Sequence, residues 1–272
     1  MLCQKQKFVK ECERAILEQV SKQLEVAIAL KDAGKHEEAD AVVNDMKKWL
    51  EEKAEKEWKP QVKKSEKTYD RTVLPGNGET IVDGDNIVIA VISLDEREKY
   101  LSVSYEYSVM KIAFEEEKFK ADLWNDFISD TSFVCSIYEK TSGEYIGYCS
   151  VKDLRKNDWE LAIELLPEKC NRGYGSEALE KFMCKVHELT GKRFFRTRVE
   201  LDNHVSQHLM KKLGGIPDGI GEFLLHGDEI TKFQENYKHL ITDEVRAVAE
   251  EFCMEAEDML GYVLEYRFDM EK

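Results

Sequence analysis

The chain has 272 residues and a formal net charge of −15, with 42% hydrophobic and 35% charged residues. This acidity disfavours binding to nucleic-acid backbones, and it either attracts a cationic substrate or partner or simply keeps the protein soluble. The seven cysteines form no C-x-x-C motif and no apolar run is long enough to span a membrane. We therefore expect free thiols, a cytoplasmic location and no membrane span.

Residues 1–66 are predicted to form an α-helical hairpin. Apolar residues recur every three or four positions in two stretches, and Gly34 interrupts the pattern where a left-handed residue can end a helix. Two helices joined by a short turn favour an antiparallel pair. The hairpin either docks on its own domain or binds a partner, such as a second copy in a homodimer. Residues 67–85 are rich in turn formers and predict a linker.

From residue 86 the pattern changes to alternating strands and helices. A β-branched run at 87–92 predicts a strand, and residues 94–129 are expected to be mostly helical. The elements predicted after these are strands at 132–138, 145–151 and 159–166, a helix at 173–189, a strand at 194–201, a helix at 203–213, a strand, a helical segment at 228–258 and a strand at 261–268. This order predicts an α/β domain over 86–272, with three layers and a mixed sheet.

The strongest chemical signal lies where the strand 159–166 runs through a short loop into the helix 173–189. The helix begins with Gly173-Tyr174-Gly175-Ser176, and glycines at a helix start let a ligand approach the backbone. Free N–H groups and the helix dipole favour an anion there, such as a diphosphate. Taken alone, the pattern is more often an ordinary tight loop.

A second block follows the strand 194–201. Asn203 is a predicted helix N-cap, Ser206 lies three residues on, and Gly214 ends the helix. Together the two blocks resemble the GCN5-related N-acetyltransferase (GNAT) superfamily: the first its pyrophosphate loop, Q/R-x-x-G-x-G/A, and the second its N-x-x-S segment. The resemblance covers about residues 86–225 and the last strand. It is closest to the subgroup that includes ribosomal-protein N-acetyltransferases.

The resemblance implies a GNAT fold with a splayed mixed sheet and acetyl-CoA between the strands 159–166 and 194–201. It also implies transfer of acetyl to a primary amine by direct attack, without a metal; the acceptor, a small molecule or a protein amine, is left open. A catalytically inactive acyl-CoA-binding module and a protein-interaction protein that acts through the hairpin are the alternatives. The segment 228–258, inserted where the family has a short turn, is either core or docking surface, or else a lid or dimer contact.

The resemblance also assigns residues to the cofactor. The backbone of the strand end is expected to pair with the pantetheine arm, through Glu164, Leu165 and Leu166. The N–H groups of the loop are expected to hold the diphosphate, from Asn171, Arg172, Gly173, Tyr174, Gly175 and Ser176. In the second block, Asn203 and Ser206 are expected to approach the cofactor. Two positions depart from the family pattern. Cys170 stands where Q/R is usual, so that Arg172 either supplies the missing charge or is an ordinary exposed arginine. Met210 stands where many members have a tyrosine as general acid.

Glu160 is the candidate general base. It lies on the strand expected to bind the cofactor, and alternation places Glu160 and Glu164 on one face of that strand. A carboxylate there could take a proton from the amine through water. The alternative is an ordinary solvated strand residue. The backbone N–H of Leu165 is the candidate for stabilising the developing oxyanion, as the family suggests.

Overall fold

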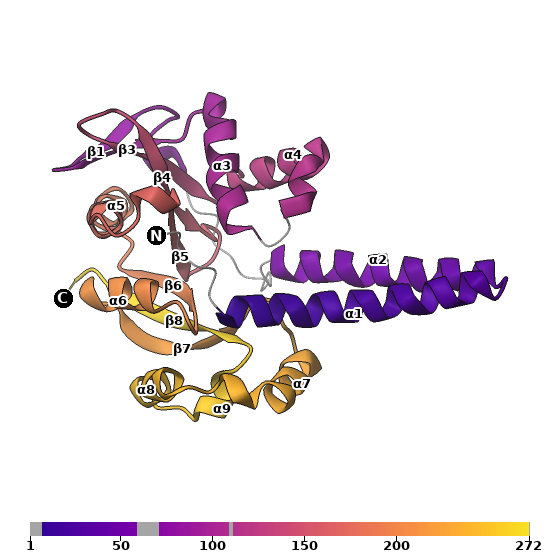
Figure 1. Cartoon of the computed structure of the whole chain (residues 1–272). Helices are drawn as coiled ribbons and strands as arrows, with labels where there is room; N and C mark the ends of the chain where they lie inside the picture. The colour runs from indigo at the N-terminus through magenta and orange to yellow at the C-terminus, as the bar shows by residue number, and fades with distance from the viewer. Residues whose placement is uncertain (1–6, 59–70, 109–110, 272) are drawn as a thin grey trace.

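The computed structural model of the chain combines a helical hairpin with a body in which helices pack on both faces of one sheet (Figure 1). It describes residues 7–58, 71–108 and 111–271. Over these residues, no helix combines the length and the apolar character that crossing a membrane requires.

The predicted hairpin is confirmed. Helices α1 (Lys7–Asp32) and α2 (His36–Trp58) pack on each other, and Gly34 in their connection has a φ of 77°. The ends of the predicted unit, residues 1–6 and 59–66, lie outside the described residues. The hairpin projects from the body (Figure 1), and among its described side chains those of Ala15 and Ile16, near its base, pack on the main core.

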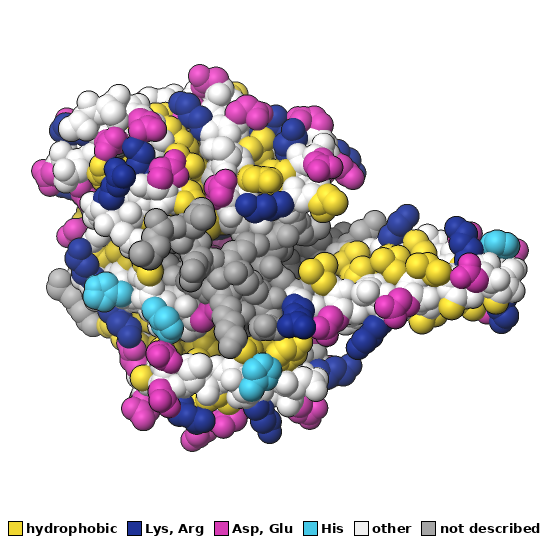
Figure 2. Space-filling view, viewed as in Figure 1, with side chains coloured by type: hydrophobic (Ala, Val, Ile, Leu, Met, Phe, Trp, Pro, Cys, Tyr) yellow, Lys and Arg dark blue, Asp and Glu magenta, His cyan; other side chains and the backbone are white. Residues whose placement is uncertain are grey.

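The projecting part of the hairpin carries apolar side chains on its surface, as Figure 2 shows in yellow. The most exposed of those described are Leu17, Val26 and Ile28, with exposed fractions of 66%, 52% and 59%. The base of the hairpin thus docks on its own chain. Binding of a partner stays a prediction for the projecting part.

The sheet has eight strands in the order β1-β2-β3-β4-β5-β6-β8-β7 in the described part of the chain. The strands are β1 (Thr80–Asp83), β2 (Ile87–Val91), β3 (Phe133–Glu139), β4 (Tyr145–Lys152), β5 (Trp159–Leu165), β6 (Phe194–Glu200), β7 (Ile216–Glu222) and β8 (Tyr262–Asp269). Neighbours run antiparallel except β5 and β6, which are parallel. The predicted mixed sheet is therefore confirmed.

Two apolar cores flank this sheet. The helices of the body are α3 (Arg97–Tyr107), α4 (Glu117–Phe127), α5 (Tyr174–Thr190), α6 (His204–Lys212), α7 (Asp228–Asn236), α8 (Asp243–Glu251) and α9 (Ala256–Met259). The smaller core is aromatic: Tyr100 of α3 stacks on Phe127 of α4, with ring centroids 3.6 Å apart, and both contact Tyr148 of β4. The larger core joins α5 and the later helices to the sheet.

The segment 228–258 forms α7, α8 and the start of α9, and its apolar stripe is core. The large buried side chains of this stripe are those of Ile230, Phe233, Leu240, Val245, Val248, Phe252 and, at the end of α9, Met259. Phe252 meets Tyr266 of β8 edge to face, with centroids 5.3 Å apart. Since these side chains are used in packing, the stripe is part of the core, and a lid or dimer contact made by this segment stays a prediction.

The sheet begins inside the predicted linker 67–85. Strand β1 pairs with β2, and the turn between them is held by Glu177 of α5, whose carboxylate accepts from the N–H groups of Asp85 at 2.6 Å and Asn86 at 3.0 Å. The sheet therefore starts before residue 86, the predicted start of the α/β domain. A short edge strand between turn residues carries too little alternation to be predicted. Linker residues 67–70 lie outside the described residues.

Candidate active site

The sheet opens between β5 and β6. These parallel strands pair only at their beginnings, where Trp159 lies opposite Phe195 and Glu160 opposite Arg196. Beyond that point β5 continues to pair with β4, and β6 with β8. The facing edges of β5 and β6 therefore carry backbone groups with no partner among the described strands, and an extended ligand can bond to such groups like an added strand.

Only alternate residues of β5 turn their backbone groups toward this opening. The Leu166 N–H donates to the carbonyl of Ile146 on the β4 side, at 2.8 Å. In an antiparallel ladder, successive residues turn their N–H and C=O groups to opposite sides of the strand. The backbone groups of Glu164 therefore point to β4, like those of Leu166, and the backbone groups of Ile163 and Leu165 point to the opening. Of the three residues predicted to pair with the pantetheine arm, Leu165 is so placed. Glu164 and Leu166 use their N–H groups within the sheet.

The end of β5 is covered by Tyr107, the last residue of α3. Its hydroxyl donates to the Leu165 carbonyl at 2.6 Å and lies 3.7 Å from the sulfur of Cys170. The Cys170 sulfur is also 3.6 Å from the carbonyl oxygen of Leu166. Cys170 therefore faces the strand end instead of offering the polar contact expected of Q/R. The sequence did not identify Tyr107, because nothing in its local pattern reports a contact 58 positions away.

The loop between β5 and α5 forms a concave group of N–H donors. Asn171 and Gly173 both have positive φ, of 60° and 88°. Left-handed residues in alternation with ordinary ones turn successive N–H groups to one side, an arrangement that binds anions. The first N–H group of α5 that donates a backbone hydrogen bond is that of Glu177, which bonds to the Gly173 carbonyl at 3.1 Å. Among the described residues, none accepts a hydrogen bond from the N–H groups of 171–176. A diphosphate fits such a site at a helix start.

Side chains of the β3–β4 hairpin hold the loop in this shape. Tyr174 donates to Glu139, and the Lys169 ammonium lies 3.3 Å from Glu139 and 2.6 Å from Glu144. The hydroxyls of Tyr174 and Ser142, followed by the Lys169 ammonium, lower the pKa of Glu139 to about 2. The carboxylate of Glu139 is therefore a firm anchor for the loop at neutral pH.

Arg172 lies at the tip of this loop. Its side chain is exposed, and no carboxylate in the described part of the chain pairs with it. Its charge is thus not paired within the described residues, in keeping with the first of the two alternatives for this residue.

Helix α6 flanks the start of α5. Asn203 is its N-cap, as predicted: the side-chain oxygen accepts from the Ser206 N–H at 2.9 Å, and the side-chain nitrogen donates to Glu200 at 3.3 Å. A Cβ placed on Gly175 would stand 3.9 Å from the side chain of Leu209, so the two helices adjoin. The predicted cofactor contacts of Asn203 and Ser206 remain predictions.

The two carboxyl groups on β5 have different surroundings. Glu160 is buried at the closed end of the opening and pairs with Arg198 at 2.8 Å and Arg196 at 3.6 Å. Glu164 lies on the same face, opposite Tyr148 of β4. Burial raises the pKa of Glu164 and the Glu200 carboxylate adds to this, while the Tyr148 hydroxyl and the Lys152 ammonium oppose it.

The position of the usual tyrosine offers no proton donor. Met210 is buried, and its sulfur lies 3.1 Å from the Thr197 hydroxyl. Over the described residues, no three His, Cys, Asp or Glu side chains are placed to hold a metal ion.

Comparison with known proteins identifies the fold. The family described as an acetyltransferase (GNAT) domain matches residues 79–216, just over half of the chain. Among curated proteins, no sequence match was found. The family match confirms the predicted fold, and the matched residues begin at 79, within the predicted linker.

Solved structures of acetyltransferases are also similar to the chain. One is a GNAT-family acetyltransferase from Bacillus anthracis, with 14% identity and a TM-score of 0.48, covering 70% of this chain and 99% of that chain. A second is spermidine N-acetyltransferase from Vibrio cholerae in complex with CoA and spermine, with 12% identity, a TM-score of 0.47 and coverage of 69% and 97%. A third is a proposed ribosomal-protein-serine acetyltransferase from Vibrio cholerae, with 13% identity, a TM-score of 0.47 and coverage of 71% and 99%.

Proposed function

The chain belongs to the acetyltransferase (GNAT) family, and we propose that it transfers acetyl from acetyl-CoA to a primary amine by direct attack. The observation that carries the proposal is the set of N–H groups at residues 171–176, which have no acceptor among the described residues and lie beside the parted edges of β5 and β6. The first feature suits a diphosphate and the second suits the amide groups of a pantetheine arm. Acetyl-CoA contains both groups in one molecule.

The N–H groups of the loop would bind the diphosphate, with Arg172 adding charge from the tip. The backbone of Leu165 and Ile163 would pair with the arm, because these residues face the opening. The Leu165 carbonyl accepts from Tyr107, and the Leu165 N–H faces the opening, beyond the residues at which β5 pairs with β6. That N–H is therefore available to the arm or to the acetyl oxygen, where an aimed donor stabilises developing charge.

Transfer forms a bond between the amine nitrogen and the acetyl carbon and breaks the carbon–sulfur bond of the thioester. The attacking nitrogen must lose a proton, and the departing sulfur must gain one or leave as thiolate. We assign the proton-accepting role to Glu164 in preference to Glu160. Glu160 would have to break its pairs with Arg196 and Arg198 to act, whereas the raised pKa of Glu164 favours proton uptake.

A catalytically inactive acyl-CoA-binding module is the second candidate. Cys170 and Met210 favour it, because neither supplies the polar contact or the proton donor that many family members have there. Such a module would bind acetyl-CoA and release no CoA in the presence of amines.

The deciding experiment measures acetyl-CoA-dependent release of free CoA with a panel of amines: polyamines, N-terminal peptides, lysine peptides and aminoglycosides. Spermine, bound in the similar Vibrio cholerae structure, belongs in that panel. Release that depends on both the amine and acetyl-CoA supports the enzyme. Binding of acetyl-CoA by calorimetry without release for any amine favours the inactive module, and absence of binding contradicts both.

A further inference from the structure

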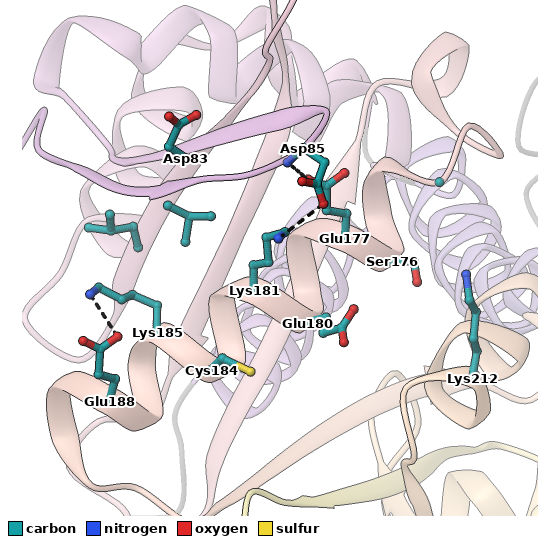
Figure 3. A pocket seen from close by; sticks show the side chains of 13 residues that line it. Asp83, Asp85, Ser176, Glu177, Glu180, Lys181, Cys184, Lys185, Glu188 and Lys212 are labelled. Atoms are coloured by element: carbon teal, nitrogen blue, oxygen red, sulfur yellow. Dashed lines mark hydrogen bonds and ion pairs between the residues drawn. The ribbon is translucent and has the colours of Figure 1, made fainter.

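A groove of about 660 Å³ runs along α5 from its first turn (Figure 3). Gly173 and Ser176, at the start of α5, line one end of it, so the groove is continuous with the N–H donors of the loop. The strand β1 lines one side of the groove and the last residue of α6 the other. Its charged side chains are those of Asp83, Asp85, Glu177, Glu180, Lys181, Lys185, Glu188 and Lys212.

Most of these charges are committed to neighbours. The Lys181 ammonium lies 3.5 Å from Asp85, the Lys185 ammonium lies 3.0 Å from Glu188, and Glu177 binds the turn before β2. Lys212 differs, because no carboxylate of the described residues pairs with it. Figure 3 shows Lys212 rising from α6, on the side of the groove where Ser176 lies. The adjacent Lys211 pairs with Glu251, outside the groove.

We propose that Lys212 binds the ribose 3′-phosphate of CoA and so makes the chain prefer acetyl-CoA over its 3′-dephospho form. The proposal rests on the proposed function. If the diphosphate is held at residues 171–176, the nucleotide end extends beside Gly173 and Ser176, and these residues also line the groove. A phosphate monoester carries nearly two negative charges and is stabilised by an ammonium group within reach. The carboxylate of Glu180, one turn further along α5, would repel a phosphate placed deeper in the groove. The end of the groove beside Lys212 is therefore the favoured position for the 3′-phosphate.

The test is calorimetric binding of acetyl-CoA and 3′-dephospho-acetyl-CoA to the full chain, without an acceptor amine. We expect the chain to bind acetyl-CoA roughly fivefold more tightly than the dephospho form at low salt. Lys212→Ala should bind both forms equally, and Lys212→Arg should keep most of the preference. Lys211→Ala is the matched control: it removes an adjacent exposed ammonium and should leave the preference unchanged.

A merely structural role gives a different result. Lys212 lies in the last turn of α6, where a cation stabilises the helix dipole, and losing that contribution would weaken binding of both nucleotides alike. A preference that survives in Lys212→Ala, or that is absent from the unaltered chain, overturns the proposal and leaves the acetyl-CoA site standing. Failure of the unaltered chain to bind either nucleotide overturns the proposed function itself.

Discussion

Gly173 is the residue on which the shape of the loop depends. Its φ of 88° is strained for any side chain, and no atom lies within 4 Å of the position a Cβ would take, so conformation and not a clash limits substitution. A β-branched residue there would turn the N–H groups of the loop away from one another. We expect Gly173→Val to weaken acetyl-CoA binding at least about 100-fold by calorimetry, while the circular dichroism spectrum is unchanged.

Gly175→Ala is the matched control for that substitution. Its Cβ would make only an ordinary contact, 3.5 Å from the Leu165 side chain, and the family pattern allows alanine at this position. Affinity close to that of the unaltered chain is expected. Equal losses in Gly173→Val and Gly175→Ala would contradict the role given to the left-handed conformation.

Glu164 governs the expected pH dependence of transfer. A base acts in its deprotonated form, and a raised pKa moves its loss of the proton toward neutral pH, so the rate should rise with pH through that pKa. Glu164→Gln should lower kcat about 100-fold and remove this rise. The pH–rate profiles of Glu164→Gln and Glu160→Gln, measured side by side, separate the two carboxyl groups. A pH-dependent rise that persists in Glu164→Gln and disappears in Glu160→Gln would return the role to Glu160.

Glu139 links the loop to the stability of the fold at low pH. Its pKa in the folded chain, about 2, lies below the ordinary value of 4.5, so the carboxylate stabilises the fold above about pH 4.5. That contribution is lost as the pH falls toward 2. Urea unfolding of the chain and of Glu139→Gln should therefore show a difference in unfolding free energy that is constant above pH 5 and shrinks below it. A difference independent of pH would contradict the anchor.

At the scale of elements, patterns within one segment predicted well and pairings between distant segments did not. The Gly-x-Gly-Ser start of α5 and the Asn203 cap of α6 are local signals, and both elements begin as predicted. Alternation correctly gave Glu160 and Glu164 one face of β5. Their different surroundings arise from β6, because the pairing of Glu160 with Arg196 and Arg198 exists only once two parallel strands meet.

The helices between β7 and β8 act as core, and this predicts a stability effect. Phe252 is buried against Tyr266, and truncating a buried phenylalanine costs about 3 kcal/mol of unfolding free energy. Urea unfolding of Phe252→Ala measures this loss. A variant with unchanged stability and an altered KM for the amine would instead indicate a lid.

Across the whole molecule, the chain places an acetyltransferase fold beside a long hairpin whose described contacts with the core lie near its base (Figure 1). The net charge of −15 would repel the anionic acetyl-CoA, so the proposed binding depends on local groups: the N–H donors of the loop and, as proposed, Arg172 and Lys212. The same charge favours a cationic acceptor.

A crystal structure of the chain with acetyl-CoA tests the site most directly. The diphosphate oxygens should lie about 3 Å from backbone nitrogens of residues 171–176, with the pantetheine arm between β5 and β6 along Leu165. A cofactor bound elsewhere would contradict the account. The account would also be contradicted if the N–H groups of the loop donated to acceptors of the protein itself and the pantetheine arm lay outside the gap between β5 and β6.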